Sequence, residues 1–161
     1  MDRLWSPWRA KYIASGVDSQ RDECVFCLIA SDSEHDEENF VLHRGEHAFV
    51  LLNLYPYISG HLMIVPYLHT SEFDTTAKEI TDEMMDLTKR AQTALREVYS
   101  PAGFNLGMNL GAAAGAGVAD HLHIHLLPRW SGDTNFMTSV AETRVLPEDL
   151  PTTYSKLRPK F

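Results

Sequence analysis

The chain has 161 residues, and its 14 Lys+Arg against 22 Asp+Glu give a formal net charge of −8. Apolar residues make up 44% and charged residues 22%, which are ordinary values for a globular protein and argue against global disorder. This length predicts a single domain over residues 1–161. The acidic excess argues against non-specific binding to nucleic acid, and no apolar run approaches the ~20 residues of a membrane helix.

Residues 1–20 contain Trp5, Trp8 and Tyr12 and are typical of an N-terminal arm or short helix that packs on the rest of the chain. This segment has no apolar signal core. The only two cysteines form a Cys-X-X-Cys pair, Cys24 and Cys27, whereas a secreted disulfide framework uses more cysteines at wider spacings. We therefore expect a reduced, cytoplasmic protein.

Short β-type runs follow a polar acidic loop over 31–39. They cover 40–42, 48–54 and 61–67, and the last two are rich in strand-forming residues. Ser59-Gly60 supplies a turn between those two, so the sequence predicts a hairpin.

One convincing helix comes next. Its apolar residues recur at helical spacing and predict a face buried in the core: Ile80, Met84, Leu87, Ala91, Leu95 and Val98. Thr76 and Glu79 fit a capping box at its start, and Ser100-Pro101 ends it.

The second half of the chain returns to strands. A strand is expected over 104–110, a glycine-rich loop over 111–117, and a strong strand over 121–127 closed by Pro128. The tail from Ser131 is mixed and is broken up by Pro147 and Pro151. Strands before and after one long helix, without regular βαβ alternation, predict an α+β fold with an antiparallel sheet.

The strongest chemical signal is the run HLHIHLL over 121–127. Side chains alternate across a strand, so His121, His123 and His125 share one face, with neighbouring Cα atoms about 6.6–6.8 Å apart. The intervening apolar residues share the other face and are placed to pack on the helix. Chance histidines on an exposed strand, or a metal site without catalysis, are the alternatives. The histidines at 35, 43 and 47 have no such context, and we expect them on the surface.

This run resembles the signature of the histidine triad (HIT) family of nucleotidyl hydrolases and transferases. The resemblance covers about 24–130, with landmarks at Asn53, Gly60-His61 with Pro66, and Asn109. The segments LWSPWR, GDTNFM and ETRVLPE are similar to the bacterial diadenosine tetraphosphate phosphorylase-like branch. The resemblance implies a HIT-like domain with about five antiparallel strands, one long helix and a shorter N-terminal helix. It also implies a homodimer and a tail over 131–161 that packs on the domain or on the dimer partner.

By this resemblance, His123 attacks the α-phosphorus of a dinucleoside polyphosphate and forms a covalent nucleotidyl-histidine, while His125 helps the leaving group depart. A neutral imidazole is a good nucleophile near pH 7, since its unperturbed pKa is ~6.5. Phosphate or water is the acceptor, and no organic cofactor is expected. The alternatives are a nucleoside phosphoramidase and a non-catalytic nucleotide-binding zinc module.

The resemblance also implies a nucleotide pocket. Asn53 binds the ribose, Asn109 with the backbone at Gly115 and Gly117 meets the phosphates, and Trp130 stacks on a second base. An apolar slot encloses the first base: Val25, Phe26, Ile29, Leu51, Leu54 and Met63. Each of these residues has a plain structural alternative in a turn, a flexible loop or the core. Many relatives carry a serine before the triad, and residues 116–120 here contain none.

The Cys24-X-X-Cys27 pair is by itself redox-active, metal-binding or inert. A redox dithiol belongs in a thioredoxin-like βαβ context, which is absent. Structural zinc needs four N or S ligands, and His69 and His121 are candidates for the other two. Zinc-carrying relatives are similar at all four positions, so we expect a structural zinc that anchors the triad strand to the N-terminal segment.

Overall fold

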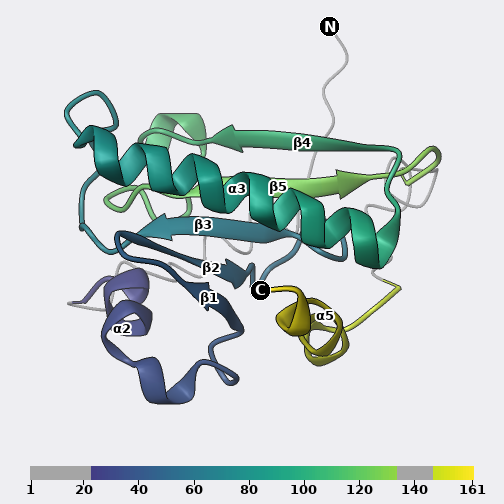
Figure 1. Ribbon diagram of the computed structural model, residues 1–161. Coiled ribbons are helices and arrows are strands. Elements are labelled where there is room, and N and C mark those ends of the chain that lie inside the picture. The colour runs from purple at the N-terminus through teal and green to yellow at the C-terminus, as the bar shows by residue number, and fades with distance from the viewer. Residues whose placement is uncertain (1–22, 134–146) are drawn as a thin grey trace, which may run out of the picture.

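The structure is a computed structural model that describes residues 23–133 and 147–161. The arm expected over 1–20, the LWSPWR segment and most of GDTNFM and ETRVLPE lie outside these residues. Five strands form one antiparallel sheet in the order β1-β2-β3-β5-β4 (Figure 1). The elements are α2 (Val25–Ser31), β1 (Val41–Arg44), β2 (Ala48–Leu52), β3 (Leu62–Pro66), α3 (Lys78–Tyr99), β4 (Gly103–Met108), β5 (Ile124–Arg129) and α5 (Leu150–Leu157).

This architecture confirms the α+β fold with five antiparallel strands, one long helix and a shorter N-terminal helix. The predicted hairpin is β2–β3, in which Ala48 pairs with Pro66 and Leu52 with Leu62. Short 3-10 turns lie at Ser33–His35 within the acidic loop, Ala112–Ala114 within the glycine-rich loop, and Arg158–Lys160 after α5. In the parts of the chain that the structure describes, no helix has the length and apolar composition needed to cross a bilayer.

The two faces of the sheet carry different packing. One face buries a core cluster against α3, whose stripe of Met84, Leu87, Ala91 and Leu95 meets Ile124 and Leu126 of β5. The other face packs against α2 through a second cluster that contains Phe26, Ile29, Leu51 and Met63. Because side chains alternate along β5, the histidines are left on the α2 face, as the period of two predicted.

The predicted capping box at the start of α3 is wrong. The helix begins at Lys78, its N-cap Ala77 provides no side-chain cap, and the Thr76 hydroxyl instead donates to the carbonyl oxygen of Glu72 at 2.6 Å. The turn that leads into the helix also ties the Thr76 N–H to the carbonyl of Phe73. Local turn bonds have therefore replaced the capping pattern.

The triad strand begins later than predicted, at Ile124 rather than residue 121, and it continues through Pro128 to Arg129. In the register with β3, Leu126 pairs with Leu62 and Ile124 with Ile64. Continued by two residues, this register would place Leu122 opposite Pro66, which has no N–H to donate to a ladder. The N–H of Leu122 bonds instead to the carbonyl of Thr70, at 2.7 Å.

The end of the chain forms α5 rather than broken structure. Pro151 lies in the first turn of this helix, where its missing N–H costs nothing, and Asp149 caps the helix by accepting from the Thr152 N–H at 2.9 Å. Leu157 is fully buried in the core cluster of α3. The helix therefore packs on the same side of the sheet as α3.

Candidate functional site: a line of histidines beside a Cys/His cluster

The three triad histidines follow one another along the α2 face of the sheet. His121 and His123 lie just before β5, and His125 lies inside it, opposite Met63 of β3. The rings of His123 and His125 are 4.8 Å apart. The ring of Phe26 lies 5.4 Å from that of His121 and 5.2 Å from that of His123. Helix α2 thus touches two of the three histidines.

His123 is held in a defined orientation by the backbone. Its Nδ1 lies 2.9 Å from the carbonyl oxygen of His121, and because a carbonyl only accepts, Nδ1 carries the proton. Burial lowers the pKa of His123, although the bond to His121 opposes the shift. The ring is therefore neutral at pH 7 and carries a lone pair on Nε2.

His125 is paired with a fourth histidine, His61, which directly precedes β3. The two rings meet through His61 Nε2 and His125 Nδ1 at 2.9 Å. The backbone N–H of Tyr57 donates to His61 Nδ1 at 3.2 Å. Because His61 Nδ1 accepts, His61 Nε2 carries the proton and donates it to His125 Nδ1, so His125 holds its own proton on Nε2.

Sequence reasoning treated His61 only as a family landmark and gave it no role. His61 is 1% exposed, and it is 64 positions from His125 in the chain. Its position directly before a strand that also carries Met63 was the available signal, because alternation places His61 and Met63 on one face.

Asn53 lies beside this pair. Its Oδ1 accepts from the Tyr55 N–H at 2.9 Å, so its Nδ2 is the atom that faces His61 Nδ1 at 3.3 Å. The structure thus places Asn53 as an anchor of the turn before β3 and as a neighbour of the His61–His125 pair. Its predicted contact with a ribose stays a prediction.

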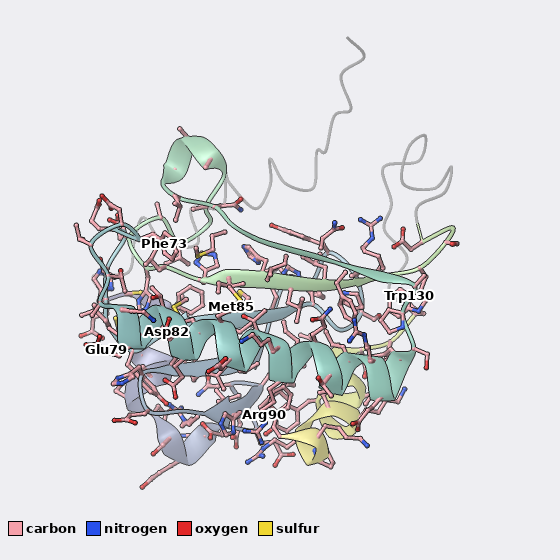
Figure 2. All side chains as sticks on the ribbon, turned by 45° about the horizontal axis from the view of Figure 1, so that its top comes forward. Phe73, Glu79, Asp82, Met85, Arg90 and Trp130 are labelled. Carbon is pink, nitrogen blue, oxygen red and sulfur yellow. The ribbon has the colours of Figure 1, made fainter. Side chains whose placement is uncertain are left out.

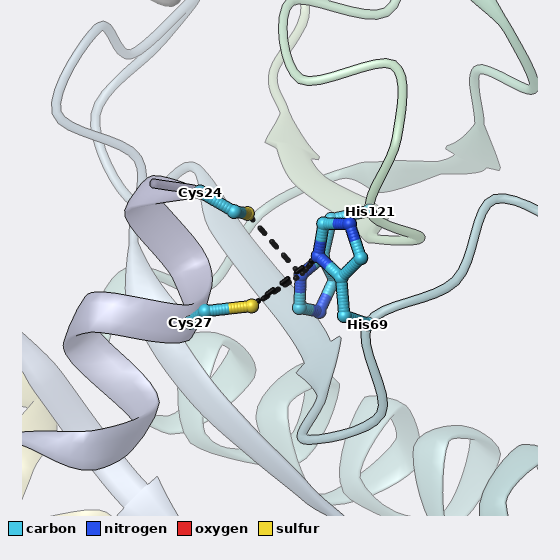
Figure 3. Close-up of side chains that lie close together, drawn as sticks. All are labelled: Cys24, Cys27, His69 and His121. Atoms are coloured by element: carbon cyan, nitrogen blue, oxygen red, sulfur yellow. Dashed lines mark hydrogen bonds between the residues drawn. The ribbon is translucent and has the colours of Figure 1, made fainter. Parts of the chain in front are cut away.

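Cys24, Cys27, His69 and His121 come together from three parts of the chain (Figure 3). The ligand atoms of the four side chains all lie within 4.8 Å of one another. His121 Nδ1 is 3.4 Å from Cys24 Sγ and 3.6 Å from Cys27 Sγ, and His69 Nδ1 is 3.2 Å from Cys27 Sγ. A tetrahedral zinc with bonds of ~2.3 Å to sulfur and ~2.05 Å to nitrogen has N–S edges of about 3.5 Å, so the donor set fits that ion.

Neighbouring groups determine where the ligands of this cluster carry their protons. His121 Nε2 donates to the carbonyl oxygen of Pro66 at 2.8 Å, which leaves the lone pair on Nδ1, the atom that faces the cysteines. Burial, followed by the neighbouring Cys24, raises the pKa of the Cys27 thiol. Metal binding must therefore displace a proton from Cys27 at neutral pH.

Arg44 fixes the C-terminal end of α2, the helix that contains Cys27 and has Cys24 as its N-cap residue. Its guanidinium donates to the carbonyl oxygens of Ile29, Ala30 and Asp32 at 2.8–3.1 Å and pairs with Asp36. A cation at a helix C-terminus is stabilising, because the last carbonyls have no partner within the helix.

The apolar residues expected around a base fall into two groups. Phe26, Ile29, Leu51 and Met63 are buried together in the cluster under α2, and Val25 packs against it. Leu54 is 47% exposed in the turn after β2.

The glycine-rich loop lies between β4 and the triad. Asn109 and Gly115 are half-buried and Gly117 is exposed. Gly111 and Gly115 adopt φ of 80° and 88°, which favours glycine at both positions. Their proposed contacts with phosphate stay predictions.

Trp130 lies at the far end of β5, against the end of α3 (Figure 2). Its indole N–H points to the Tyr99 carbonyl at 3.4 Å, and the two rings are 6.4 Å apart. Arg129 donates to both carboxylate oxygens of Asp133 at 2.6 and 2.8 Å and to Asn105 at 2.6 Å. These contacts account for both residues structurally.

Of the histidines expected on the surface, only His35 is exposed. His43 and His47 are half-buried. His43 stacks on Phe161 with ring centres 6.1 Å apart and lies 3.2 Å from Arg90. These two therefore also lie at the surface, but neighbours partly cover them.

We expect these hydrogen bonds to fix the tautomers in solution. Long-range ¹H–¹⁵N spectra at pH 8 should place the proton on Nδ1 of His123 and on Nε2 of His61 and His125, because a carbonyl and an N–H impose those states. Single His→Gln variants assign the signals, with exposed His35 as a reference ring. A proton on Nδ1 of His125 would contradict the relay from Tyr57 through His61.

Comparison with known proteins places these features in a family. The HIT domain family matches residues 34–132. The chain is 40% identical over 154 residues to an "AP-4-A phosphorylase" of Mycobacterium tuberculosis, covering 92% of this chain and 78% of that protein.

Comparison with solved structures also finds histidine triad proteins. A zinc-bound histidine triad family protein from Mycobacterium smegmatis superposes with a TM-score of 0.69 at 28% identity, covering 86% of this chain and 92% of that one. A hypothetical histidine triad nucleotide-binding protein from Sulfolobus tokodaii has the same fold, with a TM-score of 0.68 at 24% identity over 85% of this chain and 91% of its own. Together with the alternating histidines, these matches show that the chain belongs to the HIT domain family and is a nucleotide-processing enzyme.

Proposed function

We propose that this chain transfers the nucleotidyl group of a dinucleoside polyphosphate, of the diadenosine tetraphosphate type, through a covalent intermediate on His123. The observation that carries the proposal is the Nδ1 bond of His123 to the His121 carbonyl, which leaves Nε2 as a nucleophile. The relative at 40% identity supports the substrate class.

In the first step, the lone pair of His123 Nε2 attacks the α-phosphorus and the bond to the bridging oxygen breaks. The Nε2 proton of His125 passes to the departing oxygen, as its pairing with His61 allows. Positioned proton donors contribute typically ~10²–10⁴-fold. The imidazolium formed at His123 keeps its Nδ1–H on the His121 carbonyl, which favours the positive charge.

In the second step, an acceptor returns its proton to His125 and attacks the same phosphorus, and the bonding pair goes back to His123 Nε2. Splitting one displacement into two is the gain from covalent catalysis. The predicted nucleotide contacts at Asn53, Asn109, Gly115, Gly117 and Trp130 and the apolar slot under α2 belong to this proposal.

His123→Ala is expected to remove nearly all turnover of diadenosine tetraphosphate while the circular dichroism spectrum stays unchanged. His35→Ala, an exposed histidine far along the chain, is the matched control and should keep full activity. More than about a tenth of the activity left in His123→Ala, a loss below ~1.4 kcal/mol in the barrier, contradicts the nucleophile assignment.

We further propose that phosphate is the preferred acceptor, so that diadenosine tetraphosphate and phosphate give ATP and ADP. A bound phosphate competes with water because positioning is worth up to ~7–11 kcal/mol. Chromatography of the products with and without phosphate is the test. AMP with ATP at a rate that phosphate leaves unchanged would make the protein a hydrolase instead.

We also propose that Cys24, Cys27, His69 and His121 hold one structural zinc. Four protein ligands leave no open position for water, so the metal supplies stability rather than chemistry. Zinc binding needs both cysteines as reduced thiols. The cytoplasm keeps thiols reduced, so this site fits a cytoplasmic protein. The zinc-bound relative supports this reading.

His69→Ala tests the zinc site without cutting into the core, because His69 is exposed. Elemental analysis of the unchanged protein should give one zinc per chain, and the variant should lose it. The variant should also melt more than about 4 °C lower, the shift that ~2 kcal/mol produces in a domain of this size. His35→Ala should match the unchanged chain. A metal-free protein whose His69→Ala variant melts normally excludes the site.

The chain is also proposed to form a homodimer. β4 is an edge strand of the sheet, its residues Asn105, Leu106 and Gly107 are exposed, and Leu106 is 52% exposed. An open edge with an apolar side chain is a template for pairing with another copy. Sedimentation equilibrium at micromolar concentration should give twice the mass of one chain. The Leu106→Lys variant should give the mass of a single chain. A monomer of the unchanged chain contradicts the proposal.

A further inference from the structure

The neighbours of the His125 ring differ between the β3 side and the β4 side of β5. On the β3 side its ring meets His61 at 5.1 Å and Tyr57 at 6.0 Å. Along its own strand it meets His123 at 4.8 Å. On the β4 side the residue directly opposite in the ladder is Gly107, which has no side chain.

Among the described residues, none fills the space above Gly107. Apart from its two chain neighbours, a Cβ built at this position meets no described residue within 4 Å, and Gly107 is exposed. Neighbouring residues of paired strands have Cβ atoms about 4.5–5.5 Å apart, so any side chain here would stand beside the His125 ring.

The ring of His125 is oriented by its contact on the β3 side. The two nitrogens of an imidazole face roughly opposite directions, and Nδ1 of His125 faces His61 on the β3 side. Its Nε2 is therefore directed away from His61. On the side of β5 away from β3, the residue across the ladder from His125 is Gly107.

Nothing in the backbone requires a glycine at this position. The glycines with positive φ are Gly60, Gly111, Gly115 and Gly132 among the described residues, and Gly107 is not one of them. A glycine inside a strand weakens it and often marks the close approach of a ligand.

We propose that Gly107 is a specificity-determining residue that makes room for the polyphosphate leaving group and then for the incoming phosphate. The inference rests on the proposed function. Both groups occupy the same space next to Gly107. Each must enter or leave opposite the bond between His123 Nε2 and the α-phosphorus. A side chain at residue 107 would hinder the approach of phosphate more than the approach of the smaller water molecule.

Gly107→Val is the direct test, since a β-branched residue suits a strand and has open space here. We expect kcat/KM for diadenosine tetraphosphate to fall by at least about tenfold, while the Kd for AMP, which lacks the leaving group, stays within about twofold. Products should shift from ADP with ATP toward AMP with ATP. Gly107→Ala should change the same quantities less.

Gly103→Val is the matched control. It lies on the same strand and the same face, its added Cβ also meets no described atom within 4 Å, and it pairs with Arg129 about 13 Å along the strand. It should change neither quantity.

The possible outcomes distinguish a failure of the inference about Gly107 from a failure of the proposed function. Unchanged turnover in Gly107→Val, or an equal loss of AMP binding, overturns the role of Gly107 alone. No turnover of diadenosine tetraphosphate by the unchanged chain overturns the proposed function and this inference with it. If Gly107→Val melts well below the unchanged chain, Gly107→Ala decides between the same results.

Discussion

The hydrogen bond from His123 Nδ1 to the His121 carbonyl is the interaction on which the rest of the site depends. It gives His123 its tautomer, and it comes from a residue whose side chain faces Cys24 and Cys27. The Nε2–H of that same side chain is held by the Pro66 carbonyl. His121 thus joins the backbone next to His123, the metal-type cluster and the end of β3. Movement of α2 would reach His123 by this route and through the Phe26 ring.

The order of the strands explains why His125 has different surroundings on its two sides. β5 has β3 on one side and β4 on the other. The β3 side brings His61, which fixes the proton of His125, while the β4 side brings Gly107, which leaves space. The proposed reaction uses both sides: a proton donor held from β3, and the space that the described residues leave over β4. The packing of α3 is confined to the opposite face and does not obstruct this space.

The sequence predicted what local periodicity and spacing can carry. Alternation along 121–127 placed Ile124 and Leu126 against α3, because strand geometry fixes the side on which each residue lies. The four metal-type ligands were found from ligand chemistry and family resemblance, and they lie close together. The start of β5 was missed because it depends on Pro66, which is opposite in space and distant in the chain. The role of His61 was missed because its tautomer depends on the backbone N–H of Tyr57 within a turn.

The stereochemical course at the α-phosphorus tests the central claim most directly. Diadenosine tetraphosphate made chiral at that phosphorus with sulfur and an oxygen isotope is converted, and the configuration of the product is read by phosphorus NMR. Attack by His123 followed by attack of the acceptor inverts the centre twice, so the account predicts net retention. Net inversion would mean that the acceptor attacks the substrate directly, and it would contradict a covalent intermediate on His123.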